Sequence, residues 1–293
     1  MADFENSIQW KRTSDLTEHA EQSDAGITRL RIKRKRAGRK NKQRHLSVIT
    51  VAVILGLWFI ITNYGHVSSV IIPSPQSVAA SFIDILQNGY KGYTLWQHLS
   101  ISLLRLGAAY LLAVVTAVPL GLLSGYSPRV QAVLEPVIEF YRPLPPLAYY
   151  TILVLWLGIG ESSKLTLLFL AGFAPIYISC VAGVRHINRE YTAGAETLGA
   201  SRAQIFFHVI VPAALPDVFT GLRTAMGVEY TTLVAAEMVA ATVGMGWLVL
   251  DASNYLRSDI VFMGVILMGI TGILLDAVIR LIERKIVFWK KEV

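Results

Sequence analysis

The sequence has little charge for its length. Of its 293 residues, 16% are Asp, Glu, Lys or Arg and 54% are hydrophobic, whereas a typical soluble chain carries about 25% charged residues. Several stretches approach the roughly 20 apolar residues that cross a bilayer as a helix. This composition excludes an ordinary soluble domain. It predicts an all-α integral membrane protein with about six transmembrane helices.

Motifs for covalent or metal chemistry are also scarce. The one cysteine, Cys180, lies in an apolar stretch, so it excludes an intrachain disulfide or a CxxC metal site and is expected to be a small buried hydrophobe. The histidines are scattered without ligand spacing, and we expect no metal site. No GxxxxGK[ST] phosphate-binding loop is present, so the chain is expected to bind no nucleotide or other cofactor of its own.

Positive charge is concentrated in one tail. Residues 1–45 hold 12 Lys/Arg against 6 Asp/Glu, a net +6, and the rest of the chain adds only +1. Ten of the basic residues lie in RLRIKRKRAGRKNKQR, residues 29–44, just before the first apolar run. A nucleic-acid patch is one interpretation, but no aromatic residues are interleaved. We expect instead an anchor on anionic membrane lipid that fixes orientation, with no nucleic-acid partner.

The apolar runs divide the chain into five parts. A cytoplasmic, partly disordered tail is expected first, and no signal-peptide cleavage site follows the first apolar run. The parts are the tail 1–45, a first transmembrane helix 46–65, a periplasmic segment 66–100, a core 101–286 and a cytoplasmic C-terminal tail 287–293. The predicted spans are 46–64, 102–125, 145–160, 163–185, a stretch somewhere in 218–250, and 259–282. Within 66–100, PSPQSVAASFIDILQNG predicts a helix on the membrane surface.

The distribution of basic residues orients these spans. With the N-terminus inside, the inner segments hold the basic tail, Arg129, Arg142, Arg185, Arg189, Arg202 and the last basic residues, whereas the outer segments hold only Lys91, Lys164 and Arg257. Cytoplasmic loops are generally the richer in Lys and Arg. Both termini are therefore predicted to be cytoplasmic.

One inner loop, GAETLGASRAQIFFHVIVPAALP at 194–216, is unusually patterned. Residues 189–198 favour a helix, Gly199 interrupts it, and Ser201 with Gln204 matches a capping box. One apolar face comes next, made by Ile205, Phe206, Val209 and Ile210, and Pro212 and Pro216 are expected to end or kink the chain after it. The pattern predicts a rigid, bent helical segment that loses little entropy on entering a partner's groove.

An ordinary interfacial turn is the alternative. Against it, Phe206 and Phe207 would be costly to leave bare in water, and the glycine, capping box and proline are more closely spaced than a simple connector requires.

The spacing from Gly199 to Pro212 resembles the cytoplasmic coupling motif of permease subunits of ATP-binding-cassette importers, E-A-A-x3-G-x9-I-x-L-P. Ala195, Gly199 and Pro212 fit the motif; the departures are Ala193 for Glu, Gly194 for Ala, Val209 for Ile and Val211 for Leu. Beyond the motif, residues of about 70–285 look like the taurine, sulfonate and nitrate branch in the runs WQHLSISLLRL, EPVIEFYRPLPPLA, LWLGIGESSK, TLGASRAQ and LVAAEMVAAT.

This resemblance implies a type I importer permease fold in a bacterial inner membrane. It implies a pore made with a second copy of the chain, two ATPase subunits that carry ATP and Mg²⁺, and a periplasmic substrate-binding protein. The chain itself would be no enzyme, and its substrate would be taurine or a related small sulfonate. For contact with the ATPase, within coupling helices at about 189–210, it implies Ala195, Glu196, Gly199, Ala200, Ser201, Arg202 and Phe206.

Polar residues inside the spans are candidates for the substrate path, because charges there are costly and are usually paired or functional. Glu237 is predicted either to face the ammonium of a zwitterion or to form a structural bond to a neighbouring helix or to Arg105. Glu229, eight residues earlier, lies within roughly 80° of it on a helical wheel, so both can face the pore. Arg105 can attract a sulfonate or snorkel to the headgroups.

The stretch YRPLPPLAYY at 141–150 predicts a broken backbone at the mouth of the third span. Such a break is tolerated where it is buried or lines a cavity. It is interpreted as a gate or hinge with Tyr149, Tyr150 and Thr151 on the path, or as an ordinary span entry.

Other functions stay open at this point. A permease for alkanesulfonates or nitrate-type anions is the nearest alternative. From other classes, a secondary carrier usually shows internal repeats, and an intramembrane enzyme needs a catalytic pair at one depth. We find neither in the sequence.

Overall fold

The computed structural model describes residues 46, 48–65 and 67–289. The chain divides into two units, residues 1–67 and 68–293, which are described separately. The predictions for the basic tail 1–45, including lipid anchoring, lie outside the described residues. In the first unit, the helix Val48–Tyr64 covers the first predicted span.

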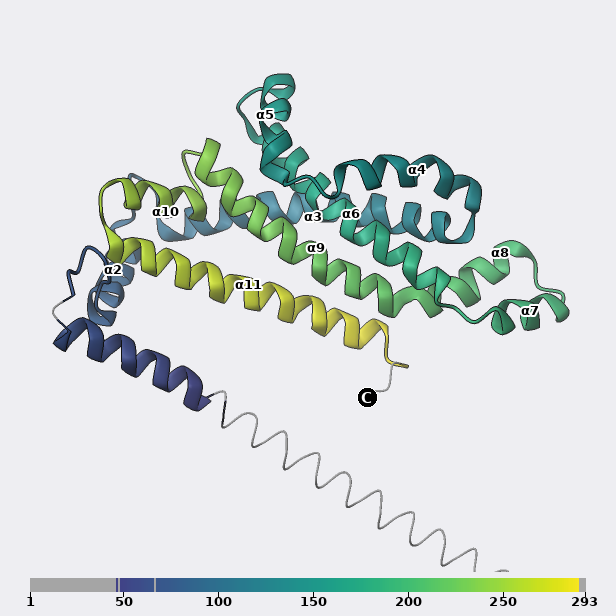
Figure 1. Cartoon of the computed structure of the whole chain (residues 1–293), viewed down its shortest axis with the longest axis horizontal. Helices are drawn as coiled ribbons and strands as arrows, with labels where there is room; N and C mark the ends of the chain where they lie inside the picture. The colour runs from purple at the N-terminus through teal and green to yellow at the C-terminus, as the bar shows by residue number, and fades with distance from the viewer. Residues whose placement is uncertain (1–45, 47, 66, 290–293) are drawn as a thin grey trace, which may run out of the picture. The chain divides into compact units, whose positions relative to one another are not determined.

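The second unit is helical in its described part (Figure 1). Its elements are α2 (Pro75–Asn88), α3 (Leu95–Tyr126), α4 (Pro128–Tyr141), α5 (Pro146–Leu157), α6 (Glu161–Arg185), α7 (Arg189–Thr197), α8 (Arg202–Ile205), the π-helix η1 (Phe206–Ile210), α9 (Val211–Ala240), α10 (Met245–Asn254) and α11 (Ser258–Ile286).

Each predicted span corresponds to an apolar helix, and most of these helices are long enough to cross a membrane. Four of them qualify by length and composition, namely Leu95–Tyr126, Glu161–Arg185, Arg202–Ala240 and Ser258–Ile286. Val48–Tyr64 and Pro146–Leu157 are shorter apolar helices. The prediction of an all-α membrane fold with about six apolar helices is confirmed.

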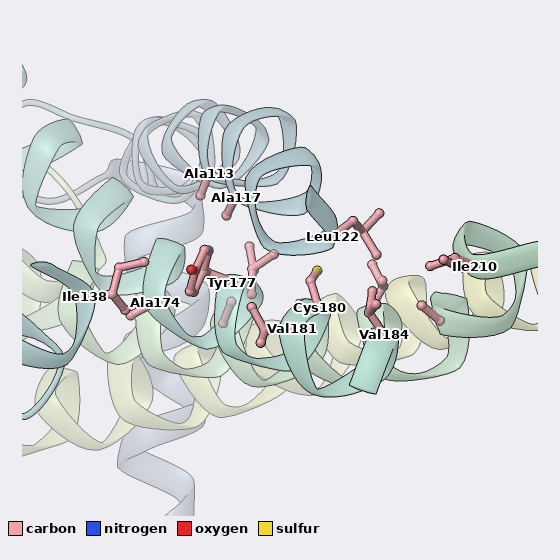
Figure 2. Packing of buried hydrophobic residues seen from close by; sticks show 14 of the residues in the cluster. Ala113, Ala117, Leu122, Ile138, Ala174, Tyr177, Cys180, Val181, Val184 and Ile210 are labelled. Atoms are coloured by element: carbon pink, nitrogen blue, oxygen red, sulfur yellow. The ribbon is translucent and has the colours of Figure 1, made fainter. Parts of the chain in front are cut away.

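Helix α6 makes the core by packing on α3 and on α9. Small residues bring the backbones together. Ala113 and Ala117 of α3 are fully buried, and a Cβ added at Gly121 would lie 2.6 Å from the Cβ of Cys180. Figure 2 shows Cys180 and Val181 on α6 between these α3 residues and Ile210. The prediction that Cys180 is a buried hydrophobe is confirmed.

The start of the second predicted span is wrong. The second span begins at Leu95, not near 102, because Thr94 and Gln97 form a capping box there. The fifth span, predicted somewhere in 218–250, is α9, which ends at Ala240, and α10 begins separately at Met245. Helix α4, which buries only Ile138 along its length, was not predicted.

The prolines 212 and 216 do not end the helix. Pro212 lies in the first turn of α9, directly after the π-helical turn, and the helix continues through Pro216 to Ala240. The chain does bend just before α9 (Figure 1), at the π-helical turn Phe206–Ile210. Such turns are a recognised cause of helix bending.

Helix α2 confirms the helix predicted within 66–100. Ser74 caps it by accepting a hydrogen bond from the Ser77 N–H. The helix is fixed to α11 by the Ser81 hydroxyl, which donates to the Asp259 carboxylate at 2.6 Å. Its position on the membrane surface stays a prediction.

Candidate coupling segment and buried charge network

The coupling segment, residues 189–210, begins with a helix that ends in a defined turn. The N–H of Gly199 donates to the Glu196 carbonyl at 2.9 Å, and the N–H of Ala200 donates to the Ala195 carbonyl at 3.1 Å. This pair of bonds is the Schellman arrangement, with Gly199 in the left-handed position at φ +82°. The predicted break at Gly199 is confirmed, and Ala195 and Ala200 shape the same turn.

The turn leads directly into a capped second helix. The Ser201 hydroxyl accepts a hydrogen bond from the Gln204 N–H at 3.4 Å, and the Gln204 side chain accepts one from the Ser201 N–H at 2.8 Å. The predicted capping box is confirmed. Both ends of the turn are therefore fixed by local hydrogen bonds, and the segment has a preformed shape.

Side chains of this segment divide into an inward and an outward set. Ile205 and Ile210 are buried, and Phe206 is half-buried with its ring centroid 5.4 Å from that of Tyr126. Outward, Leu198 is 89% exposed and Phe207 is 66% exposed. Phe206 thus packs on its own chain, and the available apolar surface belongs to Leu198 and Phe207.

The polar residues predicted for coupling lie on the outward side. Glu196, Ser201 and Arg202 are exposed. Leu198 and Phe207 were not among the predicted contacts, although Phe207 follows Phe206 directly and faces the other way on a helix. Whether an ATPase subunit touches any of these residues stays a prediction.

At the other end of α9, Glu237 is fully buried and has several hydrogen-bond donors. The Ser102 hydroxyl lies 2.7 and 2.9 Å from its two carboxylate oxygens. Arg105 Nη1 donates to Oε1 at 2.8 Å, and the Gly246 N–H donates to Oε2 at 2.9 Å. Of the two predicted roles, the structure shows the hydrogen bonds to a neighbouring helix and to Arg105.

Arg105 joins Glu237 to a second acid. Its Nε and Nη2 atoms donate to the two oxygens of Glu161 at 2.6 and 2.7 Å, and Lys164 Nζ lies 3.1 Å from Glu161. Arg105 is only 6% exposed, which rules out the snorkelling alternative. Lys164, predicted for an outer loop, is buried in the first turn of α6. We call Arg105, Glu161, Lys164 and Glu237 the charge network.

The charge network also fixes the turn between α9 and α10. Arg105 donates to the Val243 carbonyl at 2.8 Å, and the Gly244 N–H donates to His98 Nδ1 at 3.1 Å. Gly244 has φ +136°, and a Cβ there would lie 2.4 Å from the Glu237 carboxyl group. Glycine is therefore required at this position both for its backbone conformation and for space.

Further contacts join α10 to α3 and to the loop before it. The Tyr90 hydroxyl donates to Asp251 at 2.7 Å, and the His98 ring stacks on Trp247 with centroids 5.7 Å apart. Burial, followed by the bond to Asp251, raises the pKa of Tyr90. Helix α10 is thus held against the loop and α3 by directed contacts.

Glu229 differs from Glu237 in having no hydrogen-bond partner in the described part of the chain. Both are fully buried, yet neither Glu229 carboxyl oxygen has a hydrogen-bond partner among the described residues. Glu229 lies over Gly172 of α6, where a Cβ would overlap its Oε1 at 1.5 Å. Neither acid is open to solvent in the single chain, and their place in a substrate path stays a prediction.

The proline-rich stretch breaks the backbone as predicted. Helix α4 ends at Tyr141 and α5 begins at Pro146. Tyr149 lines a cavity of about 340 Å³ together with Arg142, Pro146 and Ile178. Tyr150 is buried and Thr151 is exposed, so only Tyr149 of the three faces this cavity. Transport through it stays a prediction.

Comparison with known proteins identifies the fold. Residues 117–288 match the family model described as the binding-protein-dependent transport system inner membrane component. The matched region contains the coupling segment and both buried glutamates of α9. It excludes α2 and most of α3, so Arg105 lies outside it.

Whole-chain relatives extend the match. The taurine transport system permease protein TauC of Escherichia coli (strain K12) is 42% identical over 254 residues, covering 86% of this chain and 92% of the relative. The putative aliphatic sulfonates transport permease protein SsuC of Bacillus subtilis (strain 168) is 33% identical over 88% of this chain and 92% of its own. The nitrate import permease protein NrtB of Synechocystis is 32% identical, covering 82% of this chain and 88% of the relative.

The chain belongs to the family of inner-membrane permease components of binding-protein-dependent transport systems. It is a multi-pass membrane subunit of an ATP-binding-cassette importer, a class that works with an ATPase and a substrate-binding protein. This membership decides against the secondary carrier and the intramembrane enzyme.

Proposed function

We propose that this permease carries taurine, or a related small sulfonate, into the cytoplasm. The observation that supports this most is the 42% identity, over 86% of the chain, to a permease named for taurine transport. The two relatives described above that are named for aliphatic sulfonates and nitrate are 33% and 32% identical. Alkanesulfonates and nitrate-type anions are therefore the second candidates.

In this proposal two copies of the chain form the pore and two ATPase subunits, which hold ATP and Mg²⁺, bind the coupling segments. A periplasmic binding protein delivers the substrate, and both termini lie in the cytoplasm. The preformed turn at Gly199 supports this role, because a segment that is already ordered loses little entropy when a partner covers it.

The exposed pair Leu198 and Phe207 supplies the apolar surface for that contact. A contiguous apolar patch exposed on a folded segment marks an interaction site, and we infer that these two side chains belong to one. Phe206, in contrast, stabilises the segment by packing on Tyr126.

Uptake tests the substrate. Cells that lack their own sulfonate importers, and that express the complete transporter, are given labelled taurine with excess unlabelled ethanesulfonate or nitrate as competitors. We expect ATP-dependent uptake that unlabelled taurine suppresses best. Uptake suppressed equally by nitrate would contradict the sulfonate assignment.

Co-purification tests the coupling segment. Replacing Phe207 or Leu198 by Ser is expected to lower the ATPase subunit recovered with the permease, while the permease stays in the membrane. Phe288→Ser is the matched control, because Phe288 is 79% exposed but lies after α11. Equal recovery of the ATPase in all three variants would refute the proposed contact.

A further inference from the structure

A cavity of about 360 Å³ lies between α4 and α6, at the end of the unit where α7 begins. Its walls include Arg142 just after α4 and Arg185 at the end of α6, with Glu135 and Glu139 from α4. None of these side chains belongs to the charge network or was predicted for the substrate path or the ATPase contact.

The charged groups of this wall are largely without partners. Within the described part of the chain, Arg142, Arg185 and Glu139 form no ion pair. Glu135 accepts one bond, from the Gln131 amide at 2.6 Å. Two guanidinium groups and two carboxylates therefore line one small space, and Arg142, Arg185 and Glu139 are also exposed at its edge.

A buried phenol faces the same space. Tyr177 is 3% exposed and lines the cavity, yet its hydroxyl has no hydrogen-bond partner in the described chain. Figure 2 shows this hydroxyl on the side of the ring that faces Ile138 of α4. Buried hydroxyl groups are nearly always bonded, so an unsatisfied one at a cavity wall indicates a missing partner.

Packing makes this wall rigid. Helix α6 lies so close to α3 that a Cβ on Gly121 would be 2.8 Å from the Tyr177 carbonyl. The Tyr177 ring also stacks on Phe173 with centroids 6.2 Å apart. Both the backbone and the ring of Tyr177 are therefore closely packed.

We propose that this cavity binds a small zwitterion that carries a tetrahedral oxyanion and an ammonium group, and that the occupant is the amino sulfonate being transported. Guanidinium groups bind such oxyanions through paired N–H donors, and the Glu135 and Glu139 carboxylates suit the ammonium. This assignment rests on the proposed function. A phosphatidylethanolamine headgroup has the same chemistry and is the other source of such a ligand.

The location suits a site on the exit route. The neighbouring cavity of about 340 Å³, which Tyr149 lines, shares Arg142 and Ile178 with this one. A substrate that leaves the region of α5 toward the coupling segment therefore meets Arg142 first and the second guanidinium next. The two cavities form one continuous lining on α6.

Direct binding tests the site. The permease–ATPase complex is purified without its periplasmic binding protein, and equilibrium binding of labelled taurine (2-aminoethanesulfonate) is measured. We expect saturable binding that Arg142→Gln or Arg185→Gln weakens about tenfold or more, because each substitution removes a charged hydrogen-bond donor from the oxyanion. Arg129→Gln is the matched control, since Arg129 is an exposed α4 residue outside the cavity. It should bind normally.

Two further variants separate the halves of the ligand. Glu139→Gln should weaken 2-aminoethanesulfonate but not ethanesulfonate, which has no ammonium group. Tyr177→Phe, which removes only the unsatisfied hydroxyl, should weaken both. If Glu139→Gln weakened the binding of 2-aminoethanesulfonate and of ethanesulfonate equally, the zwitterion assignment would be overturned.

The outcomes distinguish this inference from the proposed function. If cells take up taurine normally but the complex without its binding protein binds none, or binds it equally well in Arg185→Gln, the site is refuted and the function stands. If no sulfonate is taken up, the proposed function fails. Phosphatidylethanolamine that co-purifies with the wild type but not with Arg185→Gln, and that 2-aminoethanesulfonate does not displace, would overturn the substrate as occupant.

Discussion

Removing Arg105 is expected to destabilise this permease more than removing any other member of the charge network. Arg105 neutralises two acids, at 2.8 Å from Glu237 and 2.6 Å from Glu161. The substitution Arg105→Met keeps the length of the side chain but leaves Glu237, which is fully buried, with only neutral donors. Breaking a buried pair from one side costs about 3–5 kcal/mol.

The two acids should rank below Arg105, with the buried Glu237 above the half-exposed Glu161. Glu237→Gln keeps one acceptor oxygen but points an amide N–H₂ at hydrogen-bond donors. Because Arg105 still pairs with Glu161, we expect a loss of about 3 kcal/mol in the free energy of unfolding. The side chain of Glu161 is 55% exposed, and water can replace part of what Glu161→Gln removes. Its cost should be about 1 kcal/mol, as for exposed pairs.

Denaturant unfolding of the purified protein in detergent measures these differences. The variants Arg105→Met, Glu237→Gln and their double mutant form a cycle that isolates the coupling between the two residues. Arg223→Met is the control, because the Arg223–Asp276 pair at 2.9 Å is more than one third exposed on both sides. Its cost should be below about 1 kcal/mol. An Arg105→Met protein as stable as the control would refute the role given to the network.

Three more outcomes are expected. Gly199→Asn should retain ATPase coupling, whereas Gly199→Val should lose most of it with membrane insertion unchanged. No atom lies within 4 Å of an added Cβ, so the strain comes from the positive φ alone and costs about 1–2 kcal/mol. Coupled ATP hydrolysis measures the difference, and equal activity of both variants would contradict the prediction. Gly244→Ala should lower the thermal unfolding midpoint in detergent, since its Cβ would meet the Glu237 carboxyl at 2.4 Å, whereas Gly92→Ala, which has open space, provides the matched positive-φ control. The pKa of Tyr90 is raised in the folded protein, so its contribution to stability is complete below its ordinary pKa of about 10 and is lost as the pH rises above that value. Tyr90→Phe should therefore flatten the fall in stability at alkaline pH. An unchanged alkaline profile would count against the Tyr90–Asp251 bond.

Local hydrogen-bonding patterns were predictable from the sequence. The spacing of Ser201 and Gln204 alone indicated their capping box, and Gly199 indicated the break in the helix. Long apolar runs likewise predicted the membrane helices. Each of these signals depends on residues within one or two helical turns of each other.

Features that depend on distant residues were not predictable in this way. The sequence suggested Arg105 as one possible partner of Glu237, but not Glu161, Lys164 or the Gly246 N–H, which complete the site from α6 and α10. The end of the fifth span was left open within 218–250, because the contacts that turn the chain at Val243 and Gly244 come from the distant Arg105 and His98. Leu198 and Phe207 were missed because the direction of a side chain depends on which face α3 and α6 cover.

Helix α9 connects the coupling segment to the charge network as one continuous helix. Its 30 residues extend for about 45 Å at 1.5 Å per residue, with the π-helical turn at one end and Glu237 near the other. A pivot of about 5° around the middle would move each end by about 2 Å, in opposite directions, by the same geometry. Such a displacement is comparable with the 2.8 Å that separates Arg105 from Glu237. A push on the capped turn would thus reach the ion pair without any loop between them to absorb it.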